Sequence, residues 1–131
     1  MRRPWLLVVV ALTVAGITAS AAANTDLTFY SPSRNIGCEL QAFRQAPEHS
    51  HAFCVTSEPP RCVTLKANGS MRVRRGKLCI GNPPENTFML KYGRSVRGGP
   101  FRCTSRRDGM RCIVISTGHG FLISRERLTR F

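Results

Sequence analysis

Six cysteines limit the folds open to this chain more than any other feature of its sequence. They are Cys38, Cys54, Cys62, Cys79, Cys103 and Cys112. Their number is even, and no pair has the Cys-x-x-Cys spacing of a zinc site. In a short exported chain such a set forms disulfides, which add stability that a small core does not supply. We therefore expect three cross-links, formed in an oxidising compartment.

The first 23 residues have the order of a signal peptide. Two arginines precede an uncharged apolar run over residues 5–15, and small residues follow it. We expect cleavage after Ala23, with cleavage after Ala21 as the alternative, so that the secreted domain spans residues 24–131. A membrane anchor needs about 20 apolar residues. This run reaches that length only if its terminal Thr, Gly and Ser are counted as apolar, so we expect no anchor after processing.

Short strand-like segments separated by turn residues predict an all-β fold. The expected strands are Leu27 to Tyr30, Ile36 to Leu40, Ala52 to Val55, Arg61 to Lys66, Met71 to Arg74, Lys77 to Ile80, Phe88 to Leu90, Phe101 to Thr104 and Met110 to Ser116. Prolines between them exclude long helices. We predict one small disulfide-stabilised barrel or sandwich of short antiparallel strands. A short C-terminal helical turn, with Ser124 as its N-cap and with Leu128 and Phe131 on one side, should close one end.

Two hairpins can be argued from their turns, Asn68-Gly69 and Asp108-Gly109, because these residues tolerate positive φ. In the second hairpin, the two cysteines fall within about one residue of direct opposition, which makes them disulfide partners. Nearest-neighbour reasoning assigns the other four cysteines, although six cysteines allow many other connectivities. The expected pairs are Cys38–Cys54, Cys62–Cys79 and Cys103–Cys112.

Side-chain alternation predicts which faces of the second hairpin are buried. Arg102, Thr104 and Arg106 should share one face of their strand, opposite Phe101 and Cys103. The partner segment Cys112-Ile-Val-Ile is apolar on both faces, as in a central strand.

Basic residues far outnumber acidic ones. The chain has 20 Lys and Arg against 7 Asp and Glu, and loss of the leader would remove two of the arginines. Such a surface attracts polyanions. Because 17 of the 20 are arginine, the bias that a GC-rich genome produces without selection on charge, a plain cationic surface is the competing interpretation.

Two groups of arginines are the candidate binding residues. Arg72 and Arg74 share a strand face. A second group further along the chain consists of Arg94, Arg97, Arg102, Arg106, Arg107 and Arg111. From it we select Arg102, Arg106 and Arg111. If the two hairpins lie side by side, these residues form one cationic surface that grips phosphates or carboxylates bidentately. Aromatic side chains for stacking bases are sparse nearby, so we expect no sequence-specific recognition of single strands.

Histidines supply the remaining candidates. His119 stands between two glycines, which suits ligand binding or proton transfer, although a tight turn between two strands explains the same pattern. Glu48, His49 and His51 could hold a surface metal ion, but they follow a proline in what reads as a flexible loop. We therefore expect no metal and no cofactor.

Enzyme templates fit poorly, because the chain contains no Gly-x-Ser-x-Gly elbow, no phosphate loop and no His-Glu-x-x-His. The enzyme reading worth keeping is a small secreted basic ribonuclease, with His49 or His51 and His119 as acid and base. A membrane-acting cationic protein is disfavoured, since no long amphipathic helix is available.

Six segments of the secreted part form a distinctive set. They are Phe29-Tyr-Ser-Pro-Ser-Arg-Asn-Ile-Gly-Cys38, Pro-Pro-Arg-Cys62, Leu78-Cys-Ile-Gly81, Leu90-Lys-Tyr-Gly93, Gly99-Pro-Phe-Arg-Cys-Thr-Ser105 and Thr117-Gly-His-Gly-Phe-Leu-Ile-Ser-Arg125. Together they resemble a family of small exported actinobacterial proteins of unknown function. The resemblance covers nearly the whole secreted part and implies an exported six-cysteine β domain. It carries no activity, ligand or catalytic residue. Arg34 stands where the family pattern has Gly, a departure that bears on a turn.

The sequence thus favours a secreted, non-enzymatic β domain, either free or associated with the cell wall. We expect it to be a monomer and to bind an anionic envelope polymer or an acidic protein. Nucleic acid would be bound without sequence specificity.

Overall fold

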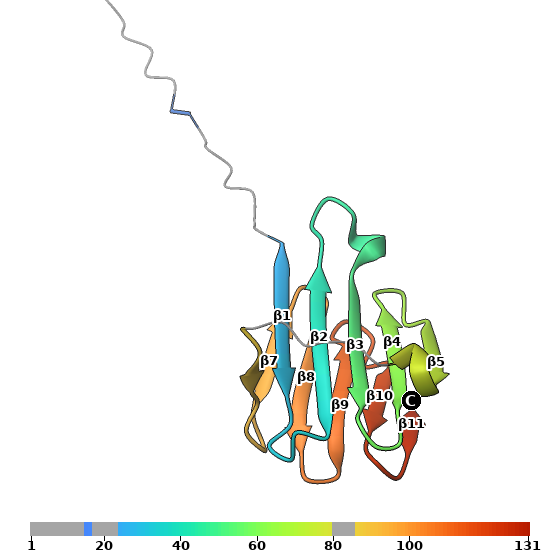
Figure 1. Ribbon diagram of the computed structural model, residues 1–131. Helices are drawn as coiled ribbons and strands as arrows, with labels where there is room; N and C mark the ends of the chain where they lie inside the picture. The colour runs from blue at the N-terminus through green and yellow to red at the C-terminus, as the bar shows by residue number, and fades with distance from the viewer. Residues whose placement is uncertain (1–14, 17–23, 80–85) are drawn as a thin grey trace, which may run out of the picture.

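Two β-sheets pack face to face in this protein (Figure 1). The structure, a computed structural model, describes residues 15–16, 24–79 and 86–131. Apart from residues 15–16, the predicted signal peptide lies outside the described residues. The sheets have the strand orders β5-β4-β3-β2-β1-β6 and β11-β10-β9-β8-β7. The all-β prediction is confirmed, in the form of a sandwich.

The strands are short, and neighbours run antiparallel except β1 and β6, which are parallel. The first sheet contains β1 Thr25–Tyr30, β2 Ile36–Ala42, β3 His51–Thr56, β4 Arg61–Lys66, β5 Met71–Arg75 and β6 Phe88–Met89. The second sheet contains β7 Ser95–Gly98, β8 Phe101–Arg106, β9 Gly109–Val114, β10 Gly120–Ile123 and β11 Leu128–Arg130. Two 3-10 turns, η1 Pro47–His49 and η2 Gly76–Cys79, complete the described secondary structure. In the described part of the chain, no helix is long and apolar enough to span a membrane.

Both predicted hairpins form, but the second turn is displaced by one residue. Asn68-Gly69 lies in the loop between β4 and β5, whereas Arg107-Asp108 is the turn between β8 and β9, and Gly109 begins β9 opposite Arg106. Gly69 and Gly109 have φ angles of 87° and 141°, a region that favours glycine. β9 lies in the middle of the second sheet, and Cys112, Ile113 and Val114 are buried, as expected for a central strand.

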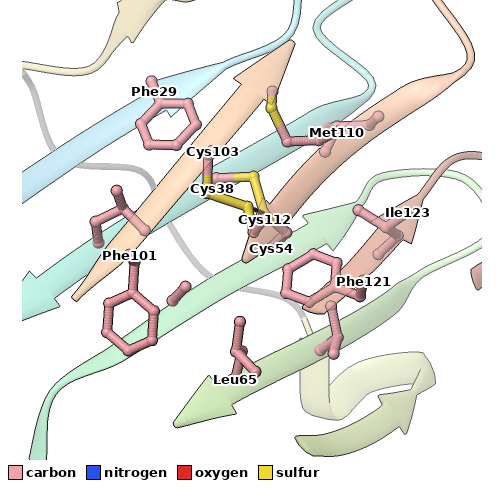
Figure 2. Close-up of a cluster of buried hydrophobic side chains, with 14 of the residues drawn as sticks. Phe29, Cys38, Cys54, Leu65, Phe101, Cys103, Met110, Cys112, Phe121 and Ile123 are labelled. Carbon is pink, nitrogen blue, oxygen red and sulfur yellow. Dashed lines mark hydrogen bonds between the residues drawn. A yellow bond between two sulfur atoms is a disulfide. The ribbon is translucent and has the colours of Figure 1, made fainter. Parts of the chain in front are cut away.

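Two disulfides meet in the middle of the sandwich (Figure 2). Cys38 and Cys54 are directly opposite across β2 and β3, and Cys103 and Cys112 are directly opposite across β8 and β9. The Sγ atoms of Cys54 and Cys112 lie 3.7 Å apart, so one bridge packs on the other between the sheets. The buried side chains around them include Phe29, Leu40, Leu65, Phe101, Met110, Phe121 and Ile123.

The third disulfide joins Cys62 on β4 to Cys79 at the end of η2. Cys62 alternates with the core residues Val63 and Leu65, so its side chain points to the outer face of the first sheet. The bridge therefore fastens η2 to the outside of the sheet. All three pairs are those expected from the sequence.

Two predicted elements are wrong. The segment predicted as a strand from Lys77 to Ile80 is the 3-10 turn η2 as far as Cys79, and Ile80 lies outside the described residues. The disulfide holds this segment across the sheet, where it has no strand to pair with.

The predicted C-terminal helical turn is instead a hairpin between β10 and β11. Ser124 Oγ accepts the Arg127 N–H at 3.2 Å, as an N-cap would, but Ser124 N–H donates back to the Arg127 carbonyl at 2.9 Å. This closed turn reverses the chain, so that Leu128 pairs with Ile123 and packs against the core. Phe131 stays exposed.

Arg34 adopts a backbone conformation that favours glycine. Its φ is 61°, the one positive value at a non-glycine residue in the part of the chain that the structure describes. A Cβ makes this left-handed region costly. The resemblance described in the sequence analysis leads us to expect Gly at this position, and the departure falls on a turn in which this residue has a positive φ.

Replacing Cys103 and Cys112 together by alanine should destabilise the fold at least as much as replacing Cys62 and Cys79. Loop closure alone favours the opposite order, because the sequence separations are 9 and 17. The core pair, however, also fills buried volume that alanine leaves empty. We expect the free energy of unfolding in urea to fall by about 3 kcal/mol or more for the core pair. A larger loss for the Cys62 and Cys79 variant would contradict the central role of the stacked bridges.

Arg34→Gly should raise the free energy of unfolding by about 1 kcal/mol, because glycine adopts positive φ without the steric penalty of a Cβ. Arg34→Ala is the matched control, since alanine removes the same side-chain contact with Tyr30 but keeps the Cβ. Urea unfolding should therefore rank the glycine variant above both the alanine variant and the natural protein. Equal stability of the two variants would rule out a strained turn at this position.

Candidate functional site

The structure separates the arginines that the sequence analysis considered together. Arg72 and Arg74 lie on β5, at one edge of the first sheet, whereas Arg102, Arg106 and Arg111 lie on β8 and β9 of the second sheet. Cross-strand register and burial place each group on the face of its sheet that points away from the core. The two outer faces lie on opposite sides of the sandwich (Figure 1). The condition for one continuous cationic surface, two hairpins side by side, is therefore not met.

The outer face of the second sheet carries most of these arginines, and we call it the arginine face. Its basic residues are Arg97 on β7, Arg102 and Arg106 on β8, and Arg111 on β9. Arg97 is the cross-strand partner of Arg102, and Arg111 is the partner of Thr104, which lies between the two β8 arginines. Paired strands are about 4.8 Å apart, so the four arginines extend outward from neighbouring positions on three adjacent strands. The five strands of this sheet contain no Asp or Glu.

Local contacts orient two of the four arginines. The guanidinium carbon of Arg111 lies 4.8 Å from the centre of the Phe131 ring, and stacking on the ring holds its planar fork in place. Arg106 Nε lies 3.0 Å from Asp108 Oδ1 in the adjoining turn. Among the described residues, neither Arg97 nor Arg102 forms an ion pair. Their charges are available to an external anion.

Charge on the outer face of the first sheet is mixed. Lys66, Arg72 and Arg74 stand on β4 and β5, but Asp26 and Glu39 occupy the same face on β1 and β2. Opposite charges on one face reduce the field that a polyanion meets. The arginine face is therefore the stronger candidate for binding anions.

His119 lies on the turn between β9 and β10, and its side chain is exposed. The imidazole rests against the β4–β5 turn, where a Cβ placed on Gly69 would be 3.7 Å from His119 Cβ. In the part of the chain that the structure describes, the ring has no hydrogen-bond or ion-pair partner. A general base is normally oriented by such a partner, so the ribonuclease alternative stays a prediction without a supporting contact.

The histidines near residue 50 do not assemble a metal site with their neighbour. His49 Nε2 lies 3.6 Å from Glu48 Oε1 on the exposed turn η1, whereas the His51 ring contacts the His49 carbonyl at 3.1 Å. Among the described residues, the one group of three potential ligands with converging atoms is Cys38, Cys54 and Cys112. Their sulfurs are all in disulfides and cannot serve as thiolate ligands.

Arg97 belongs to the second arginine group noted in the sequence, but it was not among the residues selected for binding. It stands on β7, a four-residue strand that was not predicted because the segment Ser95-Val-Arg-Gly98 is polar and lies among turn residues. The signal available in the sequence was the alternation of polar and apolar residues at Ser95, Val96 and Arg97, which matches their alternating burial in the structure. So short a pattern is also found in loops.

A comparison with curated proteins finds no match, and neither does a comparison with solved structures. The model of a family of unknown function, DUF6636, matches residues 63–131. The matched region begins in β4 and includes the whole second sheet, with the arginine face and the Cys103–Cys112 bridge. Since it makes up more than half of the sequence, this chain belongs to the DUF6636 family of unknown function.

Proposed function

We propose that this protein is an exported, non-enzymatic β domain whose arginine face binds an anionic polymer at or beyond the cell envelope. The observation that carries the proposal is the arrangement of Arg97, Arg102, Arg106 and Arg111 on the outward face of a sheet whose strands hold no acidic residue. The proposal includes cleavage of a signal peptide after Ala23, residence outside the cell and an actinobacterial origin. It also treats residues 24–131 as one domain that acts as a monomer.

A polymer suits this surface better than a small anion does. The arginines are spread over three adjacent strands, and Arg102 and Arg106 are four residues apart on one strand, which separates them by about 13 Å. A small anion reaches one or two of these groups, whereas a chain of repeated negative charges reaches all four. Each contact with a phosphate, sulfate or carboxylate is bidentate when it is made by an arginine.

Hydroxyl and apolar groups between the arginines add contacts without selecting a sequence. Ser95 Oγ and Thr104 Oγ1 lie 2.7 Å apart beside Arg97 and Arg102. Phe131 is the aromatic side chain on this face, and Arg111 already covers it. Because stacking of successive bases needs free aromatic faces, we expect nucleic acid to bind through its backbone charge alone.

Arg97→Ser combined with Arg102→Ser should weaken binding to heparin about tenfold or more at low salt, and should lower the slope of log K against log salt by about two. Both arginines lack an ion pair in the described structure, so their loss strands no buried charge. Fluorescence anisotropy with labelled heparin over a salt series measures both quantities. The melting temperature should change little, because both side chains are exposed.

The matched control is Arg72→Ser combined with Arg74→Ser, which removes the same charge from the opposite outer face. We expect this variant to lose less than about threefold in affinity, since acidic residues on the same sheet face, at Asp26 and Glu39, lower its net positive charge. Equal losses for both double variants would show that net charge, and not the arginine face, controls binding. Binding that does not respond to salt would reject the proposal.

Protein recovered from outside the producing cells should begin at Asn24 and lack six thiol hydrogens. Export places the cysteines in an oxidising compartment, where the three bridges form. Intact-mass spectrometry before and after reduction measures both features. An uncleaved N-terminus or several free thiols would contradict the export part of the proposal.

A further inference from the structure

Three turns surround a shallow pocket of about 460 Å³ at one end of the sandwich. The turn between β1 and β2 contributes Ser33, Arg34 and Asn35, and the turn between β3 and β4 contributes Ser57 and Glu58. Arg125 comes from the β10–β11 turn, so both sheets supply residues. In Figure 1 these turns lie at the lower end of the sheets, away from the turn that carries His119.

The walls of this pocket are held by hydrogen bonds between and within the turns. Ser57 N–H donates to the Asn35 carbonyl at 2.9 Å, which ties the first turn to the second. Thr56 Oγ1 donates to the Pro59 carbonyl at 2.7 Å and closes the second turn. The third turn is closed by the bonds between Ser124 and Arg127. A ligand would therefore meet turns whose backbone is already ordered, and binding would have to order only the exposed side chains.

Arg34 is held in place at the edge of the pocket. Its guanidinium carbon lies 4.9 Å from the centre of the Tyr30 ring, and Nη2 donates to Tyr30 Oη at 3.4 Å. The remaining N–H groups of the fork are free to bind an anion. A residue with positive φ is costly unless it is glycine, and Arg34 occupies such a position. The backbone at this position favours glycine, but glycine cannot supply the guanidinium group that Arg34 brings to the pocket.

The other two charged residues of the pocket are Glu58 and Arg125. Among the described residues, Arg125 and Glu58 form no ion pair, with each other or with any other group. The pocket therefore presents two guanidinium groups and one carboxylate, with two hydroxyls and one amide beside them. None of the lining residues is of an apolar type, which favours a ligand rich in polar groups.

We propose that this pocket binds a hydroxyl-rich organic acid, of which a hexuronic acid is the simplest example. Arg34 and Arg125 bind the carboxylate, since an arginine fork matches a carboxylate bidentately. The Glu58 carboxylate accepts hydrogen bonds from sugar hydroxyls, and Asn35, Ser33 and Ser57 both donate and accept. A plain anion would leave Glu58 as a repulsive neighbour, and a neutral sugar would leave both arginines unused. The site is separate from the arginine face, so either one can exist without the other.

Titration of the oxidised protein with sodium glucuronate, followed by amide chemical shifts, tests this assignment. Glucuronate should move the signals of Arg34, Asn35, Ser57 and Arg125, and should bind about tenfold or more tightly than glucose or acetate, each of which supplies half of the recognised groups. Arg34→Gly should weaken glucuronate binding about tenfold or more. Because glycine suits the backbone at this position, that loss would occur without a lower melting temperature.

Arg44→Ser is the matched control, since Arg44 is exposed on the segment between β2 and η1 and does not line the pocket. It should leave glucuronate binding unchanged. Acetate binding as tightly as glucuronate would overturn the role of the hydroxyls, and tighter binding of glycine would assign the pocket to zwitterions instead. Unchanged affinity in Arg34→Gly, or shifts confined to Arg97, Arg102 and Arg111, would remove the pocket as the site. The heparin measurements on the arginine face are independent of all these outcomes.

Discussion

The contact between two disulfides in the middle of the sandwich is the constraint on which the rest of this structure depends. Each bridge joins two directly paired strands, and the Cys54 and Cys112 sulfurs touch at 3.7 Å between the sheets. Sulfur is apolar and polarisable, so four half-cystines act here as core residues as well as cross-links. With the interior filled in this way, many outward positions are not needed for the core and can carry charge, although Cys62 and Ile113 are buried on the outer faces.

Charge is divided unevenly between the two outer faces. The outer face of the first sheet carries acidic side chains on β1 and β2 as well as basic ones on β4 and β5, whereas the strands of the second sheet contain no acidic residue. The Cys62–Cys79 bridge holds η2 on the outer face of the first sheet, where η2 occupies part of the surface. This increases the difference in exposed charge between the two faces. The DUF6636 family match spans the whole second sheet and also most of β4 and the whole of β5 and β6 of the first sheet, so it does not distinguish the two faces.

The proposed pocket at the turn end of the sandwich differs from the flat sheet faces in how it recognises a ligand. Recognition there depends on a few side chains held by short turns, with Arg34 in a backbone conformation that costs free energy. A flat charged sheet is tolerant of its partner's shape, because each contact is made independently with solvent nearby. A pocket built from three turns is selective, because several groups must be satisfied at once.

Local chemistry was enough to predict the hairpins at Asn68-Gly69 and Asp108-Gly109, the alternation along β8 and the three cysteine pairs, since each depends on residues close in the chain. The end of the chain was misjudged because Ser124 can cap either a helix or a closed turn, and β10 decides between them by offering β11 a partner. Likewise, the alternation of side chains along a hairpin does not predict which of the two sheets the hairpin joins. That choice depends on strand pairing over long sequence distances, and it is what divided the predicted arginines between two opposite faces.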